Sequence, residues 1–174
     1  MAILGVDDFK SKLIGGGARG SLFKVTPNFP GFAHGDAELA SFMCKGATLP
    51  ASTIQPLPVK FRGREIKLSG ERTFAPWTIT IINDGGLKVR SAFERWMDGI
   101  NSHEGNIGMT NTNDYMVDMI VDQLDKEGTS VKTYTIKGAW PSELGEVALS
   151  YEDTNITESS VTLEYQYWTS DTTT

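Results

Sequence analysis

The stretch Glu71–Ile100, ERTFAPWTITIINDGGLKVRSAFERWMDGI, decides the fold. Within Trp77–Ile81 apolar side chains alternate with threonines, which is the two-residue period of a half-buried strand. After an Asn-Asp-Gly-Gly break, apolar residues recur every three or four positions, which predicts a helix near 87–100 with one apolar face. The apolar residues of that face are Val89, Phe93, Trp96, Met97 and Ile100. A helix of roughly 13 residues is marginal alone, so we expect it to dock on a sheet.

Most of the remaining chain shows the alternation and turn residues of β-strands. Gly46–Pro58 contains three prolines and is expected to be a long loop, and Pro141 is expected to end a strand. The other expected strands are Ser21–Thr26, Leu39–Lys45, Val59–Phe61, Ile66–Leu68, Tyr115–Leu124, Thr133–Trp140, Val147–Tyr151 and Ser160–Trp168. The pattern predicts a mainly β (α+β) chain, a small β-barrel or sandwich of about eight strands with one flanking α-helix.

The segment Tyr115–Leu124 has two interpretations. In a strand its apolar residues face one way and its aspartates the other: Val117, Met119 and Val121 against Asp114, Asp118 and Asp122. A spacing of four also aligns the three aspartates on a helix, so the pattern alone leaves strand and helix open.

Composition bounds the class of protein. The chain has 174 residues, enough for one domain with a real core, and its net charge of −6 argues against a general nucleic-acid binder. No stretch approaches a membrane span, and the N-terminus lacks the pattern of a signal peptide. Cys44 is the single cysteine, so no internal disulfide is possible and we expect folding in a reducing cytosol. We favour Cys44 as a small buried hydrophobe over a nucleophile.

The sequence shows no catalytic or metal-binding set. His34 and His103 lie in loop-like segments, and two histidines with one cysteine make no zinc spacing. On a strand Asp118 and Asp122 would lie roughly 13 Å apart, too far for paired acid–base work. We therefore expect no enzyme and no cofactor.

The densest basic cluster of this acidic chain lies between residues 60 and 72. It comprises Lys60, Arg62, Arg64, Lys67 and Arg72. One interpretation is a solvated hairpin. The other is an electrostatic contact with an acidic surface of another subunit.

Several motifs together resemble a known family. They are Thr48-Leu49-Pro50, the Arg62-Gly63-Arg64 turn, Gly70…Arg72-Thr73-Phe74…Trp77, Asn83-Asp84 and Lys137-Gly138-Ala139-Trp140-Pro141. In this order and spacing they resemble the major tail tube proteins of contractile-tailed, T4-like bacteriophages, over roughly Ser21–Trp168. The resemblance implies rings of six copies whose inner sheets join into one barrel, stacked into a hollow tube.

The resemblance also implies roles for particular residues. Lining strands would fall near Leu39–Leu68 and Tyr115–Trp140, and Gly46–Pro58 would reach the adjacent ring. The side chains expected in the subunit core are Phe42, Cys44, Val59, Phe61, Val117, Met119, Val121, Tyr134 and Ile136. Those expected to face the channel are Asp118, Asp122, Thr133 and Thr135, and the aspartates would repel DNA phosphates. Those expected at contacts between subunits or rings are Thr48, Leu49, Pro50, Lys60, Arg62, Arg64, Lys67 and Arg72.

The implied partners are further copies of the chain, the tail sheath, baseplate and tail terminator proteins, and a tape measure protein in the lumen. Double-stranded DNA would pass transiently, and no stable membrane binding is expected. The implied location is the tail of the virion, assembled in the host cytoplasm. We expect residues 1–20 to form an arm, either floppy or ordered on assembly, with a short helix from Asp7 to Leu13 ended by Gly15-Gly16-Gly17. We expect residues 21–168 to form the tube domain and 169–174 a flexible tail.

Two rival functions stay open at this point. A related injection machine, such as an R-type pyocin or a type VI secretion ring protein, also builds its tube from hexameric rings. A monomeric β-sandwich that binds carbohydrate through its tryptophans is the rival from another class: Trp77, Trp96, Trp140 and Trp168.

Overall fold

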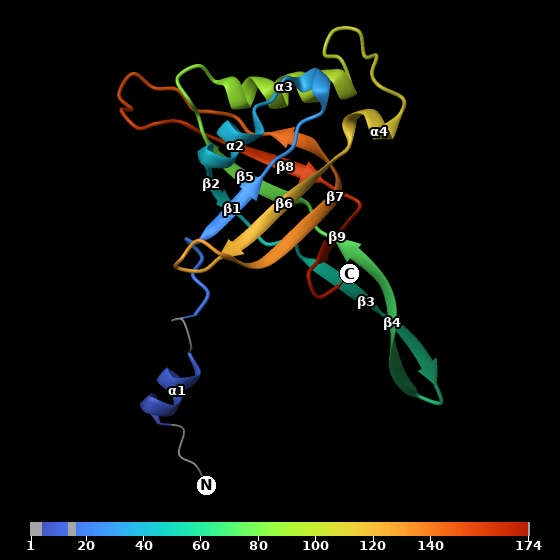
Figure 1. Ribbon diagram of the computed structural model, residues 1–174. Helices are drawn as coiled ribbons and strands as arrows, with labels where there is room; N and C mark the ends of the chain where they lie inside the picture. Colours follow the sequence, from blue (N-terminus) through green and yellow to red (C-terminus); the bar gives the residue numbers. More distant parts are fainter. Residues whose placement is uncertain (1–4, 14–16, 174) are drawn as a thin grey trace.

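A computed structural model describes residues 5–13 and 17–173 of the chain (Figure 1). Its strands are β1 (Phe23–Thr26), β2 (Cys44–Ala47), β3 (Ser52–Phe61), β4 (Arg64–Phe74), β5 (Trp77–Ile82), β6 (Val117–Leu124), β7 (Ser130–Leu144), β8 (Glu158–Glu164) and β9 (Tyr167–Ser170). Its helices are α1 (Val6–Lys12), the 3-10 turn η2 (Gly31–Ala33), α2 (Ala37–Met43), α3 (Lys88–Ile100) and α4 (Thr112–Tyr115). The mainly β prediction is confirmed, with more short helices than expected.

One curled sheet forms the body of the molecule. Its order is β1-β6-β7-β8-β5-β2, with β9 beside β7, and all of these pairings are antiparallel. The long strand β7 belongs to both halves, because residues 130–139 pair with β6 and residues 140–144 pair with β8. Gly138, with φ of 64°, lies where the partner changes, a backbone conformation that glycine adopts readily.

The core lies inside this curl and beneath α3. Trp77, Ile79 and Ile81 of β5 are buried, so the alternation read from the sequence is confirmed. Helix α3 covers the core with Phe93 and Trp96, whose rings stack 5.9 Å apart. The remaining buried apolar residues come mainly from β6, β7 and β8: Met119, Val121, Ile136, Ala139, Val161 and Leu163.

Helix α3 begins one residue after the predicted start and ends where predicted. The break before it is stabilised by Asp84, whose carboxylate accepts hydrogen bonds from the backbone N–H groups of Gly86 and Lys88 at 3.2 and 2.8 Å. The bond from Lys88 satisfies a donor that the first turn of a helix leaves unpaired, and the bond from Gly86 fixes the turn before it. Within the described residues, no helix is long and apolar enough to cross a membrane.

The expected strand Leu39–Lys45 is wrong. Asp36 accepts hydrogen bonds from the N–H groups of Glu38 and Leu39, both at 3.0 Å, and so begins helix α2; only from Cys44 does the chain continue as β2. Phe42 is consequently 79% exposed and not part of the core. Cys44 is half-buried, and burial raises the pKa of its thiol to about 11, which fits an inert side chain better than a nucleophile.

The segment Gly46–Pro58 is not a loop. It contains the end of β2 and more than half of β3, which pairs with β4 in a long two-stranded hairpin. Val59 and Phe61 lie on this hairpin at 41% and 60% exposure, so their assignment to the core is wrong. The prolines of β3 are accommodated because an edge strand needs no N–H on its free side.

Four further expectations concern the second half of the chain. Val117–Leu124 is a strand, which settles the ambiguity of that segment. Pro141 does not end β7, since it lies at a register shift and the strand continues to Leu144. Val147–Tyr151 is not a strand but part of an exposed loop before β8. β9 continues to Ser170, two residues into the expected tail.

The N-terminal segment carries the expected short helix. α1 spans Val6–Lys12, close to the predicted Asp7–Leu13, and stands away from the body (Figure 1). Two of the glycines expected to end it, at positions 15 and 16, lie outside the described residues.

Candidate assembly surfaces

The outer face of the sheet gathers the four residues predicted to face a channel. Their strands place Asp122 opposite Thr133, and Ile120 opposite Thr135. The alternate residues Met119, Val121 and Ile136 point into the core and are buried, so Asp118, Asp122, Thr133 and Thr135 share the opposite face of the sheet. Of the other residues expected in the core, Val117 and Tyr134 are partly buried and pack against it. The structure thus brings the predicted set together.

Asp118 is not a bare negative charge on this face. Its carboxylate accepts a hydrogen bond from the ammonium of Lys137 at 2.6 Å and another from the backbone N–H of Gly138 at 3.1 Å. Burial works to raise the pKa of Asp118, but the bonds from Lys137 and Gly138 and the charge of Lys137 together outweigh burial and lower the pKa. The same bond raises the pKa of Lys137.

Asp122 is held by hydroxyl groups. Thr133 donates to its carboxylate at 2.5 Å and Ser130 donates at 3.1 Å, while Lys24 of β1 lies opposite it in the ladder. The face therefore alternates acidic, basic and hydroxyl side chains. The sequence analysis missed Lys137 as the partner of Asp118, although the two residues lie in the expected strands Thr133–Trp140 and Tyr115–Leu124.

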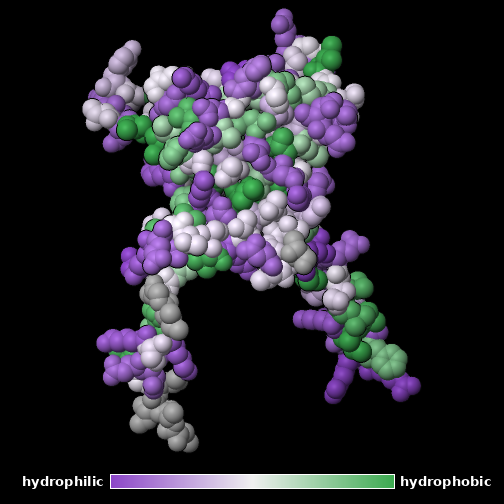
Figure 2. Space-filling model, viewed as in Figure 1, coloured by the Kyte–Doolittle hydropathy of each residue, from purple (hydrophilic) through white to green (hydrophobic). Residues whose placement is uncertain are grey.

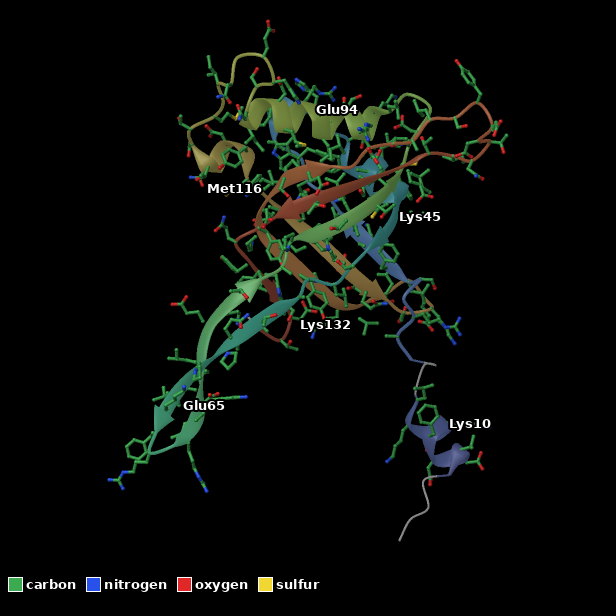
Figure 3. All side chains as sticks on the ribbon, turned by 180° about the vertical axis from the view of Figure 1, so that it is seen from behind. Lys10, Lys45, Glu65, Glu94, Met116 and Lys132 are labelled. Atoms are coloured by element: carbon green, nitrogen blue, oxygen red, sulfur yellow. The ribbon has the colours of Figure 1, made fainter. Side chains whose placement is uncertain are left out.

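The hairpin β3–β4 is a second surface, and it projects from the body (Figures 1 and 3). Arg62 and Gly63 form its two-residue turn with φ of 48° and 80°, as hairpin geometry requires. Cross-strand partners share a face, so one face carries Leu57 with Leu68 and Val59 with Ile66. The other face carries Lys60 with Glu65 and Pro58 with Lys67. Figure 2 shows apolar side chains along the hairpin and hydrophilic ones projecting from it.

The root of the hairpin is held by aromatic donors of the body. The segment Thr48-Leu49-Pro50 joins β2 to β3, and the indole N–H of Trp77 donates to the carbonyl of Thr48 at 2.6 Å. The hydroxyl of Tyr165 and the indole N–H of Trp168 both donate to the carbonyl of Ala51 at 3.4 Å. Of the residues predicted at contacts between copies, the five basic ones lie on the hairpin and the other three form its root.

The basic side chains of the hairpin make few contacts within the chain. The guanidinium of Arg62 lies 5.3 Å from the centre of the Phe61 ring, and Arg72 donates to the hydroxyl of Ser52 at 3.4 Å. Among the described residues, Lys60, Arg64 and Lys67 form no ion pair within 4.0 Å. Groups of three His, Cys, Asp or Glu side chains that could hold a metal are likewise absent from the described part of the chain.

The architecture defines a class. The overall fold is similar to that of the cap of the anti-feeding prophage tube, with a TM-score of 0.68 at 16% identity over 89% of this chain and 91% of that one. It is shared as well by a chain of the sheath–tube complex of an extracellular contractile injection system, with a TM-score of 0.63 at 14% identity over 92% and 96%. The fold is therefore one that these components of contractile injection machines have.

Sequence comparison narrows the class to a family. The model of the phage tail tube protein family matches residues 18–171, and the chain belongs to that family. It is 35% identical over 154 residues to the tail tube protein gp19 of Enterobacteria phage T4, covering 87% of this chain and 90% of that protein. It is 30% identical over 148 residues to the tail tube protein of Serratia phage KSP90, covering 83% and 84%. The chain is thus a structural protein of a phage tail tube, a part of the virion tail, and the resemblance seen in the sequence is confirmed.

Proposed function

We propose that the chain forms hexameric rings that stack into the inner tube of a contractile tail and conduct the genome into the host. The observation that carries the proposal is the apolar face of the β3–β4 hairpin, which the described part of the chain leaves uncovered. A face of this kind in a soluble protein marks a contact with another molecule. Identical copies supply such a contact in a closed ring, which also removes exposed strand edges.

The polar face of the body sheet is the proposed channel lining. Six copies of Asp118, Asp122, Thr133 and Thr135 would surround the lumen, with Lys137 beside each Asp118. Paired charges and hydroxyl groups leave little net attraction for phosphate, so DNA would pass without binding tightly. The repulsion of phosphate expected from the lining aspartates is weakened at Asp118 by its pairing with Lys137.

The proposed partners follow from the tube. They are the sheath around it, the baseplate and terminator at its ends, and a tape measure protein inside it, all met during assembly in the host cytoplasm. The role is structural and needs no catalysis. The sheath–tube complex that shares this fold supports a sheath partner. That fold equally suits the tube of a related injection system. Genes for capsid and portal proteins beside this gene would argue against that alternative.

The tryptophans do not favour a carbohydrate-binding module. Trp77 and Trp96 are fully buried, and Trp140 and Trp168 pack against the core. Stacking on a sugar requires an exposed aromatic face, so these side chains serve the fold instead.

Negative-stain electron microscopy of the purified protein across concentration tests the proposal, with and without a baseplate-like nucleator. We expect six-lobed rings or hollow rods. Protein that stays monomeric at every concentration and with the nucleator would overturn it.

A further inference from the structure

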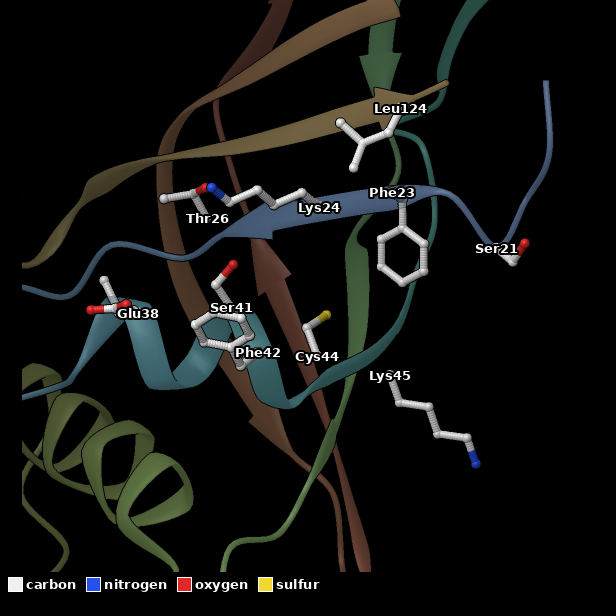
Figure 4. Close-up of a pocket in the computed structure, with 11 residues that line it drawn as sticks. Ser21, Phe23, Lys24, Thr26, Glu38, Ser41, Phe42, Cys44, Lys45 and Leu124 are labelled. Atoms are coloured by element: carbon white, nitrogen blue, oxygen red, sulfur yellow. The ribbon is translucent and has the colours of Figure 1, made fainter. Parts of the chain in front are cut away.

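A groove opens where the two ends of the curled sheet come near each other. Figure 4 shows it between β1 and β2, beside α2. Its volume is about 860 Å³, and its apolar lining comes from both end strands, from α2 and from the last residue of β6: Phe23, Phe42, Cys44 and Leu124. Neither β1 nor β2 has a second strand partner within the described residues. The described body of the chain therefore leaves an apolar surface open at this place.

Helix α1 carries an apolar side that the described residues do not cover. Val6, Phe9 and Leu13 recur at three- and four-residue spacing, so they share one side of the helix, with Leu13 at its C-cap. Their exposed fractions are 70%, 66% and 44%. Asp7 and Ser11 lie on the opposite side. A helix of seven residues is not stable in water by itself, because such a short helix needs an apolar surface to pack against.

The groove lies within reach of α1 of the same chain. α1 ends at Lys12, and the first residue in the wall of the groove is Ser21. Leu13 and Ser21 are eight residues apart in the sequence, which span at most roughly 26–29 Å when extended. A tether of this length gives the helix an effective concentration of the order of millimolar beside its own groove. In dilute solution the groove of the same chain is therefore favoured over that of another copy.

We infer that α1 of a free subunit folds back into the groove of its own chain, with its apolar side against the apolar lining. Docking covers Val6 and Phe9, and it also covers Phe42, which is 79% exposed beside the groove. In Figure 1 the helix stands away from the body, so the structure has the helix and its groove formed but apart. This undocked arrangement is that of a subunit whose groove is free for another contact.

The docked helix has a consequence for assembly that rests on the proposed function. A closed ring covers the strand edges that a free subunit exposes. A helix seated between β1 and β2 keeps both end strands from meeting another copy, and so slows assembly away from a nucleating surface. Three side chains bury little area, whereas a stable interface between copies buries roughly 800 Å² on each partner. Contacts between copies can therefore displace the helix once a nucleator holds the subunit in place.

The single cysteine supplies a test, because Cys44 lines the groove. A second cysteine is introduced on the apolar side of α1 (Val6→Cys) or, as the matched control, on its opposite side and nearer the tether (Ser11→Cys). The full-length monomers are oxidised with copper phenanthroline in dilute solution. Mass spectrometry of the non-reduced protein reports disulfides within one chain, and non-reducing gels report those between chains. Both variants are repeated with Cys44→Ser.

We expect Val6→Cys to form the disulfide within one chain at least about tenfold more than Ser11→Cys, because a disulfide needs Cα atoms within about 7 Å. The product should disappear with Cys44→Ser. Equal yields from the two variants, no disulfide in either, or disulfides only between chains would overturn the inference. None of these results depends on ring formation, so they leave the proposed function standing.

The effect on assembly is measured separately by electron microscopy. The oxidised Val6→Cys monomer should form no rings beside a nucleator until reductant opens the disulfide. Val6→Ser combined with Phe9→Ser should lower the concentration needed for assembly without a nucleator at least about fivefold, since both side chains are exposed and the body of the subunit is unchanged. Rings from the locked monomer, or an unchanged threshold in the serine variant, would overturn the role of α1 in assembly. Wild-type protein that forms no rings even with the nucleator would overturn the proposed function instead.

Discussion

Strand β5 of the body and the β3–β4 hairpin have the same alternating pattern but opposite surroundings. In β5 the apolar residues Trp77 and Ile79 are each 1% exposed, because β2 and β8 flank the strand and its apolar face packs into the core. In the hairpin, Val59 and Ile66 are cross-strand partners that the described residues leave 41% and 50% exposed. An alternating pattern therefore predicts that the apolar face of a strand is buried. It does not tell whether the same chain or another copy buries that face.

The largest effect should come from the body. Phe93→Ala removes a fully buried ring that meets Phe29 at 5.0 Å and Trp96 at 5.9 Å. We expect a loss of about 3–5 kcal/mol in the free energy of unfolding, because such a substitution leaves a cavity. Urea unfolding of the monomer measures it, with Phe42→Ala as the exposed control. A loss as large for Phe42→Ala would mean that the two phenylalanines do not differ in burial.

Substitutions on the hairpin should affect assembly much more than the stability of the monomer. Val59→Thr combined with Ile66→Thr keeps β-branched residues but removes apolar surface, and should change monomer stability by less than about 1 kcal/mol. Ring formation should fall at least about tenfold, since apolar anchors at the centre of an interface carry much of its energy. Sedimentation velocity measures the ring fraction. The control is Lys60→Gln with Glu65→Gln, a pair on the other face of the same hairpin. Unfolding of the threonine variant would contradict the contrast between the two regions.

The elements that could be predicted from the sequence are those whose apolar face is covered by segments nearby in the chain. Helix α3 was predicted within one residue because five apolar positions and the Asp84 break agree. Helix α2 was missed, although Asp36 followed by Ala-Glu is a helix-start signal, because Leu39–Lys45 was interpreted as a strand with Phe42 and Cys44 on one face.

For the candidate surfaces, the sequence indicated which residues share a face but not which side chains contact one another. The outer face with Asp118 and Asp122 follows from alternation alone. The Asp118–Lys137 pair does not, because it depends on a register shift between Val117 and Met119. The length of the hairpin was hidden by its prolines, although Arg62-Gly63 between alternating residues is a hairpin signal.

The root of the hairpin joins it to the body and can be tested separately from both. Tyr165→Phe with Trp168→Phe removes both side-chain donors to the carbonyl of Ala51 while keeping aromatic rings in place. We expect a loss of about 1 kcal/mol in stability and faster amide exchange in the first residues of β3, because each such bond contributes modestly. Hydrogen-exchange mass spectrometry measures it. Tyr134→Phe, which alters the neighbour of Trp168, is the control. Unchanged exchange at residues 51–54 would show that Trp77 alone fixes the hairpin root.

A substitution on the channel-facing sheet should change DNA passage without changing assembly. Asp122→Lys should leave rings and tubes intact, because the side chain lies on the outer face away from the core. It should slow DNA ejection from assembled particles, since six added cations per ring attract phosphate. Single-particle ejection assays measure the rate, with Asp122→Asn as the control for lost hydrogen bonding. Loss of tubes would instead place Asp122 in an interface between copies.

The smallest effect concerns the pH dependence of the Asp118–Lys137 pair. The pKa of Asp118 is lowered in the folded protein, so its contribution to stability is present above the unfolded pKa of about 3.9 and is lost as pH falls through the folded value. Asp118→Asn should therefore destabilise the monomer at neutral pH, by less than about 1 kcal/mol because the pair is partly exposed, and should match the wild type in acid. Urea midpoints at both pH values measure the difference. Lys137→Met should abolish most of it, since the ammonium is the main partner of the carboxylate. A difference that persists in acid would assign the stabilisation to the hydrogen bond from Gly138, and the balanced charge of this face would then matter to passing DNA and not to the fold.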